Sequence, residues 1–216
     1  MIILFFICYT YNVIDMKRKT YIIIFCLLFL LFLIMYLTNN INGIDNFFYN
    51  IIVKLRSDKT TNFMKFITFL ASTKFIASIV IIFLILYFLK KKKIFLGIDI
   101  LILGEVLLNN IVKVIVGRER PSLEHLVTET SYSFPSGHTM VAVVLYGLII
   151  YLLYSSKMNK NLKFSCILLL ILLIILIMIS RIYLGVHFFS DVFSGLCLSL
   201  AYLIFMIKEL EKRNLL

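Results

Sequence analysis

Long apolar runs separated by short polar segments make up most of this chain. The runs cover residues 21–37, 75–89, 94–112, 138–154, 162–180 and 187–207. A helix of about 20 residues crosses the hydrocarbon core of a bilayer, and its backbone hydrogen bonds are satisfied within the segment. The pattern therefore predicts an all-α, polytopic membrane protein built as a bundle of six transmembrane helices.

The segment between the first two runs has a different pattern. Its apolar residues recur at helical spacing, with polar residues on the other faces: Ile44, Phe47, Phe48, Ile51, Ile52 and Leu55. This spacing is typical of an amphipathic helix that lies at the membrane surface. We expect Asp45 or Asn46 to cap the start of this interfacial helix.

The first fifteen residues do not fit the pattern of spans. Residues 1–10 are apolar but too few to cross a bilayer, and no basic residue precedes them. Met16 is followed by three basic residues and then by an apolar run, which is how a signal-anchor begins. We therefore expect residues 1–15 to be a dispensable extension and residues 16–216 to form a single membrane domain. A genuine short interfacial segment is the alternative for residues 1–15.

Composition agrees with a membrane protein. Apolar residues make up 62% of the 216 residues, more than a soluble domain usually contains. The net charge of +11 would suit nucleic acid, but the basic residues lie between the apolar runs, which indicates contact with anionic lipid instead. The cysteines all lie in apolar runs without metal-ligand spacing, so we expect neither a disulfide nor zinc: Cys8, Cys26, Cys166 and Cys197.

The distribution of lysine and arginine predicts the orientation of the spans. If the N-terminus is cytoplasmic, 13 of the 22 basic residues fall on the cytoplasmic side. This modest excess follows the positive-inside rule and places both termini in the cytoplasm of a cell-membrane protein. The loops after the third and fifth spans then share the outer face.

The third run is unusual because it carries polar residues. Asp99 and Glu105 lie within it, and Glu105, Asn109 and Lys113 share one helical face. Such a face must look into protein or a hydrated cavity. We expect Glu105 to make a structural hydrogen bond to a neighbouring helix, because a carboxylate beside a bound phosphate would repel it.

The loop before the sixth run holds the first candidate for catalysis. His187 and Asp191 are four residues apart, so they share a face if the segment from His187 onward is helical. An aspartate there can accept the proton of one ring nitrogen and leave the other free to attack. His187 is therefore the candidate nucleophile and Asp191 its orienting partner.

The two outer loops also contain the parts of a phosphate site. Three cations and a Ser-Gly turn at the start of a helix would together bind an anion: Lys113, Arg120, Arg181, Ser136 and Gly137. His138, at the same helix start, could protonate a leaving oxygen. Arg118 stays outside this core set as an auxiliary head-group contact, and His125 as a loop residue. The alternatives are an ordinary solvated basic loop and a plain turn.

The motifs Lys113–Pro121, Pro135–His138 and Ser180–Asp191 together resemble the signature of the type 2 phosphatidic acid phosphatase superfamily. That group includes membrane lipid phosphatases, glucose-6-phosphatase and vanadium haloperoxidases. The resemblance covers roughly residues 40–207 and implies the phosphate contacts, proton donor, nucleophile and carboxylate partner named above. It also implies hydrolysis through a phosphohistidine without a metal or any other cofactor.

The sequences of residues 117–121 and 183–187 resemble those of bacterial members that act on undecaprenyl diphosphate. The resemblance therefore implies an undecaprenyl-diphosphate phosphatase that recycles the peptidoglycan carrier at the outer membrane surface. Phosphatidylglycerophosphate or phosphatidate phosphatase activity is the alternative. A non-enzymatic lipid transporter or scaffold on the same bundle is a distant one. Haloperoxidase chemistry fits poorly, because a membrane bundle without a soluble domain suits lipids better.

Overall fold

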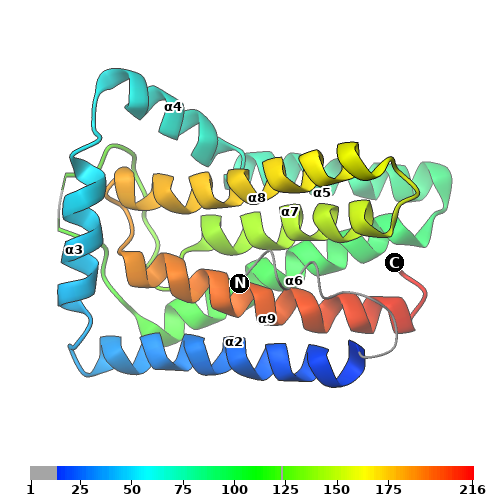
Figure 1. Ribbon diagram of the computed structural model, residues 1–216, viewed down its shortest axis with the longest axis horizontal. Helices are drawn as coiled ribbons and strands as arrows, with labels where there is room; N and C mark the ends of the chain where they lie inside the picture. The colour runs from blue at the N-terminus through cyan, green and yellow to red at the C-terminus, as the bar shows by residue number, and fades with distance from the viewer. Residues whose placement is uncertain (1–13, 123) are drawn as a thin grey trace.

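The computed structural model describes residues 14–122 and 124–216, and within these residues the chain forms eight helices and no strand. The prediction for residues 1–15 falls largely outside this range, although the first described helix already begins at Ile14. The helices, labelled in Figure 1, are α2 (Ile14–Leu37), α3 (Asn42–Val53), α4 (Asp58–Phe69), α5 (Thr73–Lys90), α6 (Lys93–Val116), α7 (Gly137–Ser155), α8 (Lys160–Tyr183) and α9 (Phe189–Lys212).

Six stretches of the described chain are long and apolar enough to cross a membrane, which confirms the predicted multi-pass, all-α architecture. Five of them are single helices: α2, α6, α7, α8 and α9. The remaining stretch, Asp58–Lys90, contains both α4 and α5. The chain turns between these two helices, and Ser72 caps α5 by accepting a hydrogen bond from the Phe75 amide at 3.3 Å.

The long helices lie along one another in the bundle, and α7 and α9 are its centre (Figure 1). Helix α9 packs against α2 and α7, while α7 also packs against α6 and α8. Burial agrees with this arrangement: 72% of the most apolar stretch of α9 is buried, but only 6% of that of α2. Exposed apolar side chains on α2, such as Leu27 and Ile34, suit contact with lipid.

Helix α3 lies across one end of the bundle, next to the loop after α6 and the loop between α8 and α9 (Figure 1). The opposite end is joined by an ion pair of 2.8 Å between Arg18 of α2 and Glu211 of α9. Exposed Phe47 and Ile51 on α3 agree with the predicted amphipathic, interfacial helix.

The predicted cap of this helix is wrong. Helix α3 begins at Asn42, so Asp45 lies in its first turn and caps nothing. Asp45 is only 2% exposed, and its carboxylate accepts hydrogen bonds from Arg118, in the loop after α6, and from Ser190, in the first turn of α9. A buried carboxylate requires charged or hydrogen-bonding partners, and this requirement outweighs local capping.

Candidate active site

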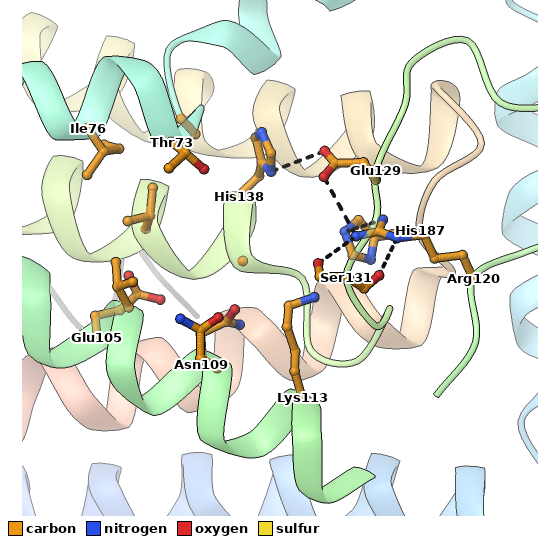
Figure 2. A pocket seen from close by; sticks show the side chains of 15 residues that line it. Thr73, Ile76, Glu105, Asn109, Lys113, Arg120, Glu129, Ser131, His138 and His187 are labelled. Carbon is orange, nitrogen blue, oxygen red and sulfur yellow. Dashed lines mark hydrogen bonds and ion pairs between the residues drawn. The ribbon is translucent and has the colours of Figure 1, made fainter. Parts of the chain in front are cut away.

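A cavity of about 280 Å³ lies between the α4–α5 turn, α6, the loop after α6, the start of α7 and the turn before α9. Five residues predicted for the site line this cavity: Lys113, Arg120, Gly137, His138 and His187. Figure 2 shows His138 and His187 on separate segments, with Lys113 rising from α6 on the opposite side of the cavity from His138. Residues from the loop after α6, the start of α7 and the turn before α9 are therefore brought together, as the sequence predicts.

His187 lies in the short turn between α8 and α9, two residues before the first residue of α9. The turn depends on Gly185, whose φ of +78° disfavours any residue with a Cβ atom. A Cβ atom at this position would also collide with the Glu124 carbonyl. The predicted helix therefore starts later than expected, although His187 and Asp191 still face each other.

The two ring nitrogens of His187 have different surroundings. The Nδ1 atom lies 3.5 Å from Asp191 Oδ2 and 3.3 Å from Ser133 Oγ. The Nε2 atom lies 3.3 Å from Arg120 Nη1 on the cavity side. One nitrogen is thus positioned by a carboxylate and a hydroxyl, and the other faces the cations of the cavity.

Burial and nearby charge keep the imidazole of His187 unprotonated. The side chain is 2% exposed, and desolvation lowers the pKa well below its usual value. Arg181, Arg120 and Lys113 lower it further, because each disfavours a second positive charge nearby. A neutral imidazole is the form that can attack phosphorus.

Asp191 is completely buried and fully hydrogen-bonded. Its carboxylate accepts from the Phe188 amide at 2.9 Å, from Ser133 Oγ at 2.5 Å and from Arg118 Nη1 at 2.7 Å. The bond from Phe188 also satisfies an otherwise free amide at the start of α9. Asp191 therefore has a single fixed orientation toward His187.

Arg118 is placed differently from the prediction. It is 4% exposed and does not line the cavity, whereas the sequence predicts an auxiliary head-group contact. Its guanidinium pairs with Asp45 at 2.8 Å and with Asp191 at 2.7 Å. The group also lies over the Phe188 ring, 4.1 Å from its centroid. Arg118 therefore fixes Asp191 on the side away from His187 and, through Asp45, connects α3 to the site.

Arg120 and Lys113 are the cations that face the cavity. Arg120 donates to the carbonyls of Ser131 at 2.7 Å and Val186 at 2.8 Å, which fixes the plane of its guanidinium. Burial lowers the pKa of Arg120, without removing its charge at neutral pH. Lys113 donates to the Tyr132 carbonyl. Both side chains therefore present positive charge beside His187.

Arg181 does not line the cavity, although the sequence predicts a phosphate contact there. It is 1% exposed and donates to Thr68 Oγ1 at 2.7 Å and to the carboxylate of Glu129. Glu129 also lies 3.7 Å from Arg120 and 3.9 Å from His138 Nδ1 (Figure 2). A single carboxylate thus lies between Arg120, Arg181 and His138.

Sequence reasoning missed Glu129. The available signal was weak: Glu129 is one of two acidic residues, with Glu124, between Arg120 and the Pro135–His138 motif. A second missed residue is Ser133, whose hydroxyl links Asp191 to His187. His125, predicted as a loop residue, lies in the loop and its Nε2 is 2.7 Å from the Pro121 carbonyl.

The Ser136-Gly137 turn forms the start of α7, as predicted. The Ser136 amide donates to the Asp191 carbonyl at 3.0 Å, so the turn is attached to α9. Ser136 Oγ accepts from Thr139 at 3.2 Å, and Ser136 itself is buried and does not line the cavity. Gly137 does line it, and helix N-termini of this kind attract anions.

Glu105 does not make the expected structural hydrogen bond. It is 1% exposed, and neither carboxyl oxygen has a hydrogen-bond partner within the described part of the chain. The side chain lines the inner part of the same cavity (Figure 2).

Comparisons with known proteins agree with this geometry. Residues 95–215 match the model of the PAP2 superfamily, and the chain belongs to this family of membrane phosphatases. The chain is 34% identical to phosphatidylglycerophosphatase B of Bacillus subtilis (strain 168) over 192 residues, covering 86% of this chain and 94% of that protein.

Two solved structures are also similar. The PAP2-type phosphatidylglycerolphosphate phosphatase of Bacillus subtilis superposes with a TM-score of 0.79 at 30% identity, covering 88% of this chain and 96% of the other. LpxE of Aquifex aeolicus gives a TM-score of 0.53 at 27% identity, covering 76% and 92%. The chain is thus a PAP2 lipid phosphatase, as the sequence motifs predict.

Proposed function

We propose that this protein removes the terminal phosphate of phosphatidylglycerophosphate through a phosphohistidine on His187. The observation that carries the proposal is the asymmetric setting of His187. Its Nδ1 faces Asp191 and Ser133, whereas its Nε2 faces the cavity beside Arg120.

In the first step, Nε2 of His187 attacks the phosphorus atom and the bond to the lipid oxygen breaks. Asp191 stabilises the positive charge that develops on the ring. His138, on the other wall of the cavity, gives a proton to the departing alkoxide. Arg120, Lys113 and the amide of Gly137 bind the phosphoryl oxygens, whose charge is spread in the transition state.

In the second step, water attacks the phosphorus atom and the P–N bond breaks. His138, now neutral, accepts a proton from that water, so inorganic phosphate leaves and both histidines return to their starting state. The entering phosphate replaces the Glu129 carboxylate beside Arg120 and Arg181. Arg181 would contact the phosphate only after that exchange, which reconciles its predicted role with its position behind Glu129.

The choice of lipid rests on similarity. The chain is 34% identical to phosphatidylglycerophosphatase B over 192 residues, and this favours the glycerolipid alternative over undecaprenyl diphosphate. Undecaprenyl diphosphate is the second candidate substrate, favoured by the sequences of residues 117–121 and 183–187. The excess of basic residues on one side supports cytoplasmic termini and a cavity that opens to the outer face.

The test is phosphate release by the purified, full-length protein in mixed micelles containing EDTA. We expect the highest kcat/KM on phosphatidylglycerophosphate, a lower value on phosphatidate, and the lowest on undecaprenyl diphosphate. A reversed order would overturn the proposed substrate, and activity that disappears with EDTA would overturn the metal-independent route. Absence of turnover on all three lipids would favour a transporter or scaffold.

A further inference from the structure

The inner wall of the cavity contains a carboxyl group that the hydrolytic steps do not use. Glu105 lines the cavity, is 1% exposed, and has two carboxyl oxygens without hydrogen-bond partners in the described part of the chain. No ion pair involves it among the described residues. Buried polar groups are nearly always paired, so an unpaired one that faces a cavity suggests a missing ligand.

The depth of Glu105 indicates which part of a ligand it meets. Glu105, Asn109 and Lys113 follow one another at intervals of four residues on α6, and all three line the cavity (Figure 2). Helical rise places Glu105 about 12 Å from Lys113 along the axis. A phosphate held by Lys113 would therefore have its lipid portion beside Glu105.

Asn109 is less available than Glu105. Its side-chain nitrogen donates to the Pro135 carbonyl at 3.3 Å and contacts Met140 Sδ at 3.1 Å. These bonds attach α6 to the turn at the start of α7. Glu105, one turn deeper, is the group on this face with unused hydrogen-bonding capacity.

The cavity at this depth also reaches the outside of the bundle. Val106 and Asn110, on the neighbouring face of α6, line the cavity and are exposed, Val106 by 38%. A lipid with its head group at Lys113 could therefore pass Glu105 and extend its tails into the bilayer between these residues.

We infer that Glu105 binds an ester carbonyl of the substrate's diacylglycerol portion and so selects glycerolipids over polyprenyl diphosphates. This inference rests on the proposed phosphatidylglycerophosphatase function. An uncharged carboxyl group, the form favoured by burial away from cations, has an O–H that donates to a carbonyl oxygen. The glycerophosphate spacer of phosphatidylglycerophosphate separates its terminal phosphate from its esters, which suits the depth of Glu105.

A polyprenyl diphosphate places no hydrogen-bond acceptor beside the Glu105 carboxyl group. Beyond its second phosphate it has only hydrocarbon, which would leave Glu105 buried and unpaired in the complex. Sites built to hydrogen-bond a substrate group discriminate against molecules that lack it, because the protein's polar atom then stays unsatisfied.

The test compares kcat/KM of full-length variants on phosphatidylglycerophosphate and on undecaprenyl diphosphate. We expect Glu105→Leu to lower kcat/KM on the glycerolipid about 10-fold, mainly through KM, and to leave the polyprenyl substrate unchanged or improved. Glu105→Gln keeps a donor and should retain most of the glycerolipid activity. Equal losses on both substrates, or no loss on either, would overturn the inference.

Asp99→Leu is the matched control. Asp99 lies on the same helix, is 3% exposed, and also has two unpartnered carboxyl oxygens, but it does not line the cavity. This variant should leave the ratio of the two kcat/KM values unchanged. A shift in that ratio as large as that of Glu105→Leu would assign the effect to helix α6 in general and overturn the inference.

A substrate analogue provides a test that does not depend on the folding of any variant. Diether phosphatidylglycerophosphate lacks the ester carbonyls, so wild-type protein should hydrolyse it with a KM about 10-fold higher than that of the diester. In Glu105→Leu the two lipids should become equal. An unchanged KM for the diether in the wild type would overturn the inference and leave the proposed function intact. The proposed function itself fails on a different result, a wild-type preference for undecaprenyl diphosphate or no turnover of any of the lipids.

Discussion

The wall of the cavity that carries His187 and the wall formed by α6 are built in opposite ways. Behind His187, the carboxylate and the guanidinium that support the ring both have partners: Asp191 accepts from Phe188, Ser133 and Arg118, and Arg118 also pairs with Asp45. On α6, Glu105 is equally buried, and neither of its carboxyl oxygens has a hydrogen-bond partner among residues 14–122 and 124–216.

The difference corresponds to two tasks. A nucleophile must be held in one geometry, so its supporting groups are satisfied within the protein. A group that recognises a ligand must keep hydrogen-bonding capacity free until the ligand binds. We therefore expect mutations of the residues that support His187 (Asp191, Arg118 and Asp45) to reduce turnover strongly. Mutation of Glu105 on α6 should change substrate selectivity instead.

The largest effect should come from the nucleophile itself. His187→Ala should abolish detectable phosphate release, since no other imidazole in the described chain faces Asp191. His138→Ala should reduce kcat by about 10²- to 10⁴-fold, the usual contribution of a general acid. His125→Ala is the control, because His125 lies outside the cavity lining and should leave kcat unchanged. Near-normal activity of His187→Ala would refute the assignment of the nucleophile.

The next effect tests the support behind Asp191. Asp45→Ala leaves Arg118 with one carboxylate instead of two, and removing one partner of a buried ion pair typically costs about 3–5 kcal/mol. We expect a lower Tm in detergent and a reduced kcat with KM little changed. Asp58→Ala, in the exposed first turn of α4, should change neither quantity. If Asp45→Ala has wild-type Tm and kcat, the position of Arg118 and Asp191 behind His187 does not depend on α3.

The smallest effect is a shift in pH dependence. Because burial and three cations lower the pKa of His187, the ring stays neutral as the pH falls past about 6.5, the ordinary histidine value. The acidic limb of kcat/KM should therefore lie below that pH. By the same linkage, the contribution of neutral His187 to stability is present above about pH 6.5 and decreases as the pH falls. An acidic limb at or above pH 6.5 would contradict the described surroundings of the ring.

The sequence was sufficient for the spans and for most of the predicted site residues that line the cavity. Apolar runs of sufficient length predict membrane helices directly. The motifs around the site have residue types with specific chemistry, and they contain Lys113, Arg120, His138 and His187. These features depend on local order along the chain, and the structure confirms the six spans.

Other features depended on contacts between distant segments. Asp45 looks like a helix cap and Arg118 like a surface cation until the fold brings them together, 73 residues apart in the chain. Glu129 appears as an ordinary loop residue, and only the fold places it between Arg120 and Arg181. The lack of a partner for Glu105 is likewise invisible in a sequence.

The exposure of Val106 and Asn110 on α6 has a consequence for what happens after hydrolysis. One product is an uncharged or singly charged lipid and the other is free phosphate, and the cavity offers them different surroundings. In the proposed reaction the lipid can move sideways past α6 into the bilayer, whereas inorganic phosphate is hydrophilic and leaves into water. The two products therefore separate into different phases, and each turnover is protected from recombination.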